Sequence, residues 1–347
     1  MKAAILKEQN KPLKIVDLDL PDKLGYGQVL VKVHYTTICG SQLNEIDGTK
    51  GKDDFLPHCL GHEGSGVVER VGPGVTTVKK WDKVVLHWRK GEGIQSATPK
   101  YKWVVQKIRY NKKPSVDIVI NAGWVTTFQE KAVVSENRVT KIPDDDVDMS
   151  LMPLYGCALT TGYGIIHRDA KMKTGESILI FGAGGLGIAV VLMAKLINAN
   201  PIVVVDISDY KLKKAELFGA TKTINSLKEG IKEECFDVVV DTTGIKGVRE
   251  QAYELTSNEG VTVYAGVPPK GQRIRIDSFP LHFNKRITGS HGGDAMPHKD
   301  IPRLINLQRK SFDLKEMITH TYKLKDINEA IKKVREGNCI KCLIKMN

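Results

Sequence analysis

The chain has 347 residues, of which 41% are hydrophobic and 27% are charged. This length allows two domains with separate hydrophobic cores, and the composition is that of an ordinary globular protein. No apolar run approaches the ~18 residues that span a membrane, and the N-terminal residues lack the apolar stretch of a secretory signal. We therefore expect a cytoplasmic protein without a membrane partner.

The net charge of +12 comes from 52 basic and 40 acidic residues. Such an excess could serve nucleic acid, an anionic membrane surface or an acidic small substrate. The lysines are spread along the chain, and no aromatic–basic repeat accompanies them. A solvated, lysine-rich surface is therefore favoured, and no nucleic-acid partner is expected.

Residues 1–152 show the pattern of short strands separated by turns. The predicted strands are rich in β-branched residues and cover 28–35, 64–71, 83–87 and 131–135. Gly72, Pro73 and Gly74 form one of the turn signals between them. This part of the chain predicts an all-β fold, a partly closed barrel.

Beyond residue 152, predicted strands alternate with predicted helices. The strands cover 177–181, 202–206, 237–241, 261–265 and 286–289, and helices such as 185–198 and 208–218 lie between them. Apolar strands linked by helices predict an α/β fold with a doubly wound parallel sheet. Residues 290–347 contain a predicted helix at 324–336 and a terminal strand, and we expect them to return to the first domain. The expected domains are therefore 1–152 with 290–347, and 153–289.

A glycine-rich turn follows the first strand of the predicted parallel sheet. Gly182, Gly184 and Gly187 form a GxGxxG motif that opens an apolar helix, and Asp206 ends the next strand. In this context the motif is a Rossmann dinucleotide fingerprint. Gly182 permits the tight turn, Gly184 lets a pyrophosphate approach the backbone, and Gly187 allows the helix to pack on the strand.

Asp206 is predicted to accept hydrogen bonds from the adenosine ribose, and its charge would repel a 2′-phosphate, so NAD is favoured over NADP. Capping of the following helix is the simpler alternative, and Lys211 and Lys213 leave the choice of cofactor open. The rest of the predicted cofactor-binding set includes Gly185, Leu186 and Thr242.

Cys39, His62 and Cys157 are candidate ligands of one metal ion. Each of them alone is most simply a buried side chain. Together, two thiolates and an imidazole give zinc three ligands and leave a fourth position for water or an alcohol, as catalytic zinc sites require.

The chain resembles the zinc-containing medium-chain dehydrogenase/reductase family, which includes alcohol and polyol dehydrogenases, over nearly its full length. The resemblance rests on ICGS at 38–41, GHEG at 61–64, GCALTTGYG at 156–164, GAGGLG at 182–187 and GGDAMPHKDIPRLI at 292–305. It implies a GroES-like β-barrel catalytic domain beside a Rossmann NAD-binding domain. The ligand set of Cys39, His62 and Cys157 is that of alcohol dehydrogenase and rests on this resemblance.

The resemblance also implies roles for residues around the metal. Ser41 matches the residue that takes the alcohol proton, and a hydroxyl can both donate and accept. Glu63 matches a carboxylate beside the ligand histidine that transiently approaches the metal. Lys341 matches an arginine that binds the cofactor pyrophosphate. Zinc would act as a Lewis acid while hydride passes between the carbinol carbon and nicotinamide.

Several features of the family are missing from this chain. Gln42 replaces the aspartate that orients the ligand histidine, and we expect its amide oxygen to take over that task. Asn44 replaces the terminal histidine of the proton relay, and Gly40 replaces a basic residue on the pyrophosphate. The four cysteines of a structural zinc site are also absent, because no cysteine lies between Cys59 and Cys157. We therefore expect one zinc ion per chain.

Residues 87–113 carry eight basic residues against one acid, Glu92. One interpretation is a charged flap for an anionic substrate such as a phosphorylated sugar alcohol. A solvated surface loop is the simpler interpretation and is favoured.

Cys339 and Cys342 form a CxxC motif in a segment predicted to be a strand. Residues i and i+3 of a strand point to opposite faces, so we expect the two cysteines to pack and not to share a metal ion.

These observations predict a zinc-dependent oxidoreductase that transfers a hydride between NAD(H) and a polar, sugar-like or anionic alcohol or carbonyl compound. A homodimer or homotetramer is expected. The alternatives are an enzyme like glutathione-adduct formaldehyde dehydrogenase, a zinc-free quinone or enone reductase of the same superfamily, and a non-catalytic relative that binds nucleic acid.

Overall fold

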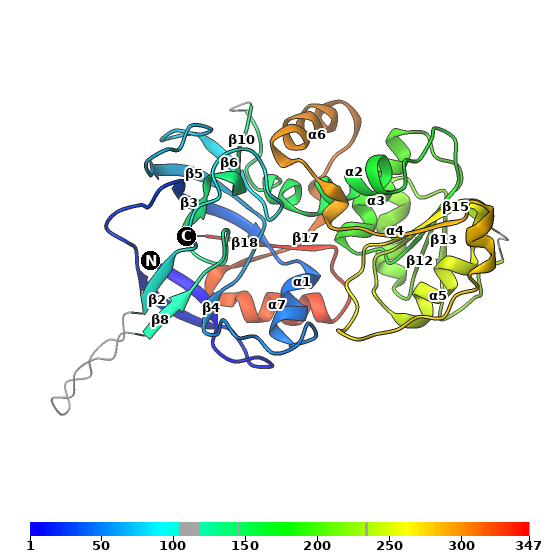
Figure 1. Cartoon of the computed structure of the whole chain (residues 1–347), viewed down its shortest axis with the longest axis horizontal. Helices are drawn as coiled ribbons and strands as arrows, with labels where there is room; N and C mark the ends of the chain where they lie inside the picture. Colours follow the sequence, from blue (N-terminus) through cyan, green and yellow to red (C-terminus); the bar gives the residue numbers. More distant parts are fainter. Residues whose placement is uncertain (104–117, 144–145, 233–234, 347) are drawn as a thin grey trace.

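The computed structural model describes residues 1–103, 118–143, 146–232 and 235–346. A β-rich part and an α/β part lie side by side along the long axis of the molecule (Figure 1). Within the described ranges, no helix has both the length and the apolar character needed to cross a membrane.

The β-rich part contains a closed barrel with the strand order β1-β2-β7-β8-β4. Its strands are β1 (Lys2–Leu6), β2 (Lys14–Asp19), β4 (His58–Cys59), β7 (Lys100–Trp103) and β8 (Ile118–Asn121). A seven-stranded sheet follows the order β10-β6-β5-β3-β18-β17, with β9 also paired to β3. Its strands are β3 (Gln28–Thr37), β5 (Gly64–Val71), β6 (Lys83–Leu86), β9 (Lys131–Ser135), β10 (Val139–Lys141), β17 (Ile318–Lys323) and β18 (Lys341–Lys345). Because β18 pairs antiparallel with β3, the end of the chain returns to the first sheet as expected.

The α/β part is built on a six-stranded parallel sheet with the order β13-β12-β11-β14-β15-β16. Its strands are β11 (Ile178–Phe181), β12 (Ile202–Asp206), β13 (Lys222–Asn225), β14 (Phe236–Asp241), β15 (Thr256–Tyr264) and β16 (Arg286–Gly289). This is the 3-2-1-4-5-6 order of a Rossmann fold. Successive residues of β11 enter two separate apolar clusters, Ile178 on one face and Leu179 on the other. Burial on both faces explains the continuous apolar strands of the sequence.

The α-helices are α1 (Gly40–Ile46), α2 (Ala158–Gly164), α3 (Gly185–Leu196), α4 (Asp209–Phe218), α5 (Lys246–Glu254), α6 (Pro297–Ser311) and α7 (Ile327–Arg335). The 3-10 helices are η1 (Glu136–Arg138), η2 (Met152–Gly156), η4 (Phe279–Phe283), η5 (Gly292–Asp294), η6 (Lys315–Met317) and η7 (Leu324–Asp326), and η3 (Ile165–Asp169) is a π-helix. The predicted fold class, a Rossmann sheet beside a GroES-like barrel, is confirmed.

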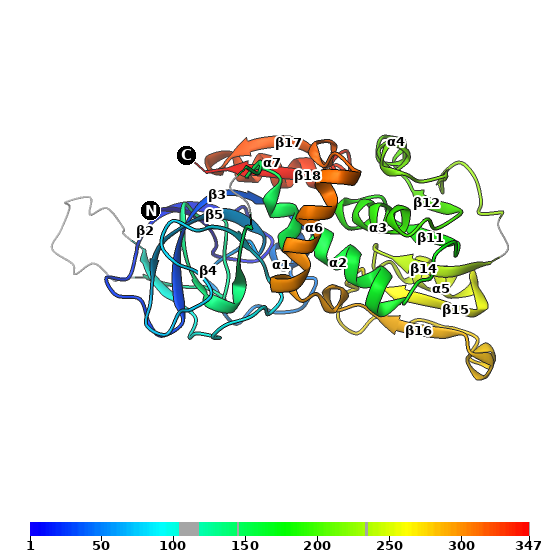
Figure 2. The ribbon, with the colours of Figure 1, turned by 90° about the horizontal axis from the view of Figure 1, so that it is seen from above.

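The two parts meet along η2, α2 and α6. The 3-10 helix η2 packs on β5 and β6, while α2 packs on α3 and on α6. Figure 2 shows α2 and α6 between the two sheets. A side chain at Gly164 in α2 would meet the backbone oxygen of Gly293 at 1.7 Å, so this contact is very close. The C-terminal end of α2 therefore packs closely against η5.

Candidate active site

Three loop or cap positions bring Cys39, His62 and Cys157 together. Cys39 is the N-cap residue of α1, directly after β3. His62 lies between β4 and β5, and Cys157 joins η2 to α2. Their potential ligand atoms all lie within 4.8 Å of one another. The structure thus assembles the predicted ligand set from segments that are far apart in the sequence.

The residues of this cluster fit a zinc ion. His62 Nε2 is buried and has no hydrogen-bond partner among the described residues, so a buried polar atom is left for an additional group. Two thiols and one imidazole are the donors that zinc prefers, and three protein ligands leave one position open.

The other ring nitrogen of His62 faces α1. Ser41 Oγ lies 3.4 Å from His62 Nδ1, and the Gln42 side-chain nitrogen lies beside the same atom. Gln42 Oε1 instead accepts a hydrogen bond from the Cys39 backbone N–H at 2.9 Å. In the structure the amide oxygen faces the Cys39 backbone and the amide nitrogen faces His62, the reverse of the expected orientation. Gln42 still holds both ligand segments together, without a negative charge.

The protons of the three candidate ligands are strongly coupled. A hydrogen bond from Cys157 is the largest cause that holds the pKa of Cys39 well below that of a free thiol. The same bond raises the pKa of Cys157. Burial alone would lower the pKa of His62, but the neighbouring thiol of Cys39 and the charge of Glu63 raise it. A thiolate at Cys39 is the form that binds a cation.

Glu63 and Lys341 form a buried ion pair beside the cluster. Lys341 Nζ donates to Glu63 Oε1 at 2.5 Å, and the two side chains are 4% and 0% exposed. Burial raises the pKa of Glu63, although Lys341 opposes the shift. Burial would lower the pKa of Lys341, but the charges of Glu63, Cys39 and Cys157 together outweigh burial, and the pKa is raised. The expected contact of Lys341 with the pyrophosphate stays a prediction; in this structure the ammonium group of Lys341 contacts Glu63.

The glycine loop has the geometry of the predicted dinucleotide site. Gly182 has a φ of +95°, and a side chain there would meet Thr242 Oγ1 at 2.4 Å. Thr242 Oγ1 donates to the carbonyl of Phe181 at 2.8 Å and so supports the turn. A side chain at Gly184 would meet no described atom within 4 Å, whereas one at Gly187 would strike the Gly182 oxygen at 1.8 Å. The loop therefore leaves space at Gly184, where a pyrophosphate is expected, and has none at Gly187, where the helix packs on the strand.

Asp206 stands at the end of β12, beside this loop. Its carboxylate accepts hydrogen bonds from the backbone N–H of Ala183 at 2.8 Å and of Ser208 at 2.9 Å. Leu186, at the start of α3, is half-buried and packs on the core.

The cofactor loop and the metal cluster are joined through one side chain. A side chain at Gly185 would meet Lys341 Cε at 2.7 Å, so the stem of Lys341 lies against the loop. The far end of the same lysine holds Glu63, next to His62. The two predicted sites therefore form one continuous site.

Two models of known families match this chain. Residues 25–144 match the alcohol dehydrogenase GroES-like domain, and residues 185–310 match the zinc-binding dehydrogenase family. The chain is 30% identical to alcohol dehydrogenase 6 of Peromyscus maniculatus, over 99% of its own length and 97% of the relative's. The chain belongs to the zinc-type medium-chain alcohol dehydrogenase family.

Other members of the family are similar over the whole length. This alcohol dehydrogenase is 31% identical to an S-(hydroxymethyl)glutathione dehydrogenase of Escherichia coli O6:H1, over 99% of both chains. Its structure matches that of benzyl alcohol dehydrogenase from Acinetobacter calcoaceticus with a TM-score of 0.86, at 26% identity, over 100% and 99% of the two chains. The predicted family and enzyme class are confirmed, and the zinc-type assignment leaves no reason to favour a zinc-free reductase.

The described basic residues of segment 87–113 do not gather in one place. Lys100 and Lys102 lie on β7, whose partner β8 is at the end of the barrel away from the α/β part (Figure 1). Arg89 is the member near the ligands. Four other members lie outside the described residues: Lys107, Arg109, Lys112 and Lys113.

Trp88 and Arg89 extend the candidate active site, and the motif analysis missed Trp88. The Trp88 ring lies 6.4 Å from the His62 ring, and the Arg89 guanidinium carbon lies 5.7 Å from the Trp88 ring. Arg89 also contacts His291 at 2.6 Å and Asp294 at 3.2 Å. The only sequence signal for this cluster was the local excess of positive charge.

The prediction for the CxxC motif is wrong in its geometry. Strand β18 begins at Lys341, so Cys339 precedes the strand and does not follow its alternation. The sulfur atoms of Cys339 and Cys342 lie 3.1 Å apart.

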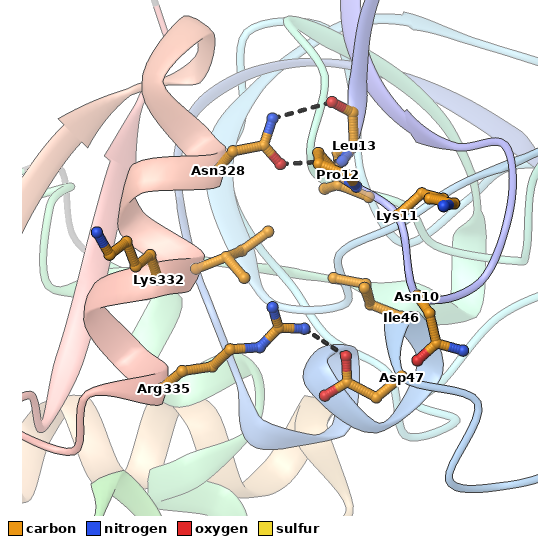
Figure 3. A pocket seen from close by; sticks show the side chains of 10 residues that line it. Asn10, Lys11, Pro12, Leu13, Ile46, Asp47, Asn328, Lys332 and Arg335 are labelled. Carbon is orange, nitrogen blue, oxygen red and sulfur yellow. Dashed lines mark hydrogen bonds and ion pairs between the residues drawn. The ribbon is translucent and has the colours of Figure 1, made fainter.

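A surface pocket of about 420 Å³ lies at the opposite end of α1 from Cys39. Figure 3 shows Asn328 of α7 hydrogen-bonded to both backbone groups of Leu13, and Arg335 paired with Asp47. None of the predicted site residues lines this pocket. The contacts of Asn328 and Arg335 connect α7 to Leu13 and to the C-terminal end of α1.

Proposed function

We propose that this enzyme transfers a hydride between NAD(H) and a polar, anionic alcohol or carbonyl compound, at a zinc ion held by Cys39, His62 and Cys157. The anionic substrate class is proposed from the position of Arg89. The Trp88 ring lies near both the Arg89 guanidinium and the ring of the ligand His62. The proposal keeps Ser41 and Glu63 as residues of the catalytic machinery.

Zinc bound at the cluster would supply Lewis acidity at the open position. Alcohol oxidation sends a hydride to nicotinamide and releases one proton. Ser41 Oγ, 3.4 Å from His62 Nδ1, is the hydroxyl we assign to accept that proton while donating its own. Asn44 does not titrate, so we infer that water carries the proton onward. Lys341 positions Glu63 beside His62. We assign Lys341 no contact with the reacting atoms of the substrate.

The cofactor assignment rests on Asp206, whose carboxylate stands next to the glycine loop. Changing Asp206→Asn keeps an oxygen that accepts from Ala183 and removes the charge that repels a 2′-phosphate. We expect the ratio of kcat/KM for NAD to that for NADP to fall by about tenfold, equivalent to about 1.4 kcal/mol. Initial rates with both cofactors measure it. An unaltered ratio would show that Asp206 does not select the cofactor.

The substrate assignment rests on the surroundings of Arg89. Its Nε atom is buried and has no hydrogen-bond partner within the described part of the chain. Its carboxylate partner among the described residues, Asp294, has a side chain that is 68% exposed, which weakens the pair. A guanidinium that is held by His291 and paired with an exposed acid suits a phosphate or carboxylate on a substrate.

Changing Arg89→Met tests this assignment. We expect kcat/KM for anionic alcohols to fall about 10- to 100-fold, the effect of about 1.5–3 kcal/mol for a hydrogen bond to a charged group. Rates with uncharged alcohols should change little. Neighbouring Lys90 is exposed, so Lys90→Met is the matched control. Steady-state assays over sugar phosphates, polyols and simple alcohols measure the effect, and an equal loss on all classes would refute an anion-binding role.

A second candidate substrate is a hydroxymethyl adduct of glutathione. It is favoured by the 31% identity to S-(hydroxymethyl)glutathione dehydrogenase. This compound is itself an anionic alcohol, so adding it to the panel of substrates and comparing its kcat/KM with that of the sugar phosphates distinguishes the two.

We propose that the chain divides into two domains, one of residues 1–152 with 290–347 and the other of residues 153–289. We also propose a homodimer or homotetramer, and a cytoplasmic location.

A further inference from the structure

His320, Cys339 and Cys342 form a second cluster of potential metal ligands, separate from the catalytic one. One ring nitrogen of His320 and the two sulfur atoms all lie within 4.8 Å of one another. The cluster belongs to the C-terminal strands β17 and β18, whereas the catalytic ligands lie in loops and at helix caps. The proposed hydride transfer makes no use of these three side chains.

An irregular strand pairing builds the cluster. β17 and β18 are parallel, and His320 is paired directly with Cys342. The register shifts between Ile318 and His320, so Thr319 lies in a bulge. Bulges redirect side chains and are common next to functional sites. Cys339 stands before the start of β18, where the strand alternation does not apply.

Thr319 organises the turn that carries the two cysteines. Its Oγ1 accepts a hydrogen bond from the Ile340 backbone N–H at 3.2 Å. The same hydroxyl lies 3.4 Å from Cys339 Sγ and 3.1 Å from His320 Nδ1. The hydroxyl therefore contacts both an imidazole and a thiol of the cluster, as the groups behind metal ligands commonly do.

Burial and donor type distinguish this cluster from ordinary core packing. Cys339 and Cys342 are 5% and 0% exposed, and their sulfur atoms lie 3.1 Å apart. Packing alone does not require two thiols and an imidazole to converge. His320 is half-buried, so solvent reaches one side of the cluster. A cation can enter from that side, and water can complete its coordination.

We propose that His320, Cys339 and Cys342 bind a second thiophilic divalent cation, for which the two sulfur donors and one nitrogen donor favour Zn²⁺. Two thiolates balance its charge, and their protons are released when it binds. The chain would then hold two ions, one more than the single zinc expected from the sequence.

The second cation would also act on the active site through Lys341. This lysine lies between the two cysteines in the sequence, and its Nζ donates to Glu63 beside His62. A metal that holds Cys339 and Cys342 together restricts the backbone at Lys341. The second site would therefore position the lysine that joins the cofactor loop to the catalytic cluster.

Metal analysis of the purified full-length protein tests this proposal. We expect two zinc ions per chain. The variants His320→Ala and Cys342→Ser should each lose one ion, and so should Cys39→Ala, whereas a variant that combines Cys39→Ala with His320→Ala should hold none. Cys235 is exposed and belongs to neither cluster, so Cys235→Ser is the matched control that should keep two ions.

Titration of the metal-free protein with Co²⁺ provides an independent readout. Cobalt–thiolate absorption should stop rising at two equivalents of Co²⁺ in the unmodified protein and at one equivalent in His320→Ala. His320→Ala is used because it perturbs the core less than Cys342→Ser. A limit of one equivalent in the unmodified protein, unchanged by His320→Ala, would overturn the proposal. So would a Cys339–Cys342 disulfide that yields no second metal site after reduction. Neither result affects the catalytic zinc, whose loss is seen separately in Cys39→Ala.

Discussion

Changing Cys157→Ala will remove the catalytic zinc and lower kcat/KM by at least about a thousandfold. The loss of one of three protein ligands opens the cluster, and Lewis-acid stabilisation worth about 4 kcal/mol disappears with the metal. Residual binding of the dinucleotide should remain, because Cys157 does not belong to the glycine loop.

Zinc analysis and NAD reduction assays on the same preparation measure this effect. The control is Cys59→Ala, which deletes a buried thiol that is not one of the described ligand candidates. Binding of NADH, followed by its fluorescence, shows that the variant is folded. If Cys157→Ala retained its zinc and its turnover, the ligand assignment would be wrong.

Changing Lys341→Met will lower the free energy of unfolding by about 3–5 kcal/mol, because it leaves Glu63 buried without its partner. Both side chains are almost fully buried, so water cannot replace the lost contact. The substitution could also remove packing at the cofactor loop, since the lysine stem lies against Gly185. Methionine preserves most of that packing and isolates the charge.

The double variant Lys341→Met with Glu63→Gln should recover most of the lost stability, because it no longer contains an unpaired charge. Denaturant unfolding of the two single variants and the double variant gives the coupling energy. Lys345 is exposed on the same strand, so Lys345→Met is the matched control. Simple addition of the two single effects would contradict a coupled pair.

The architecture was predictable because its signals are local. β11 and β12 are continuous apolar runs, and the loop between β11 and α3 has glycines where the turn requires them. The prediction failed for Cys339 because strand alternation was applied to a residue that precedes the strand. A boundary that differs by two residues reversed the conclusion about the CxxC motif.

The ligands of the candidate site were predictable from motifs, but most of their partners were not. The partner of Lys341 is 278 positions away in the sequence, and the fold alone brings it to Glu63. Gln42 could be placed beside His62, yet which of its atoms faces the ring depends on the Cys39 backbone. Arg89 was one of many basic residues until the fold set it next to His291 and Asp294.

Chelation followed by metal replacement tests the central claim most directly. The enzyme is freed of metal, and hydride transfer to NAD is followed by absorbance with the best substrate of the panel, before and after Zn²⁺ is added. We expect no measurable turnover without metal. Added zinc should return the unmodified protein and His320→Ala each to its own starting rate, but it should not activate Cys157→Ala. Turnover by the metal-free protein would contradict a zinc-dependent hydride transfer at Cys39, His62 and Cys157.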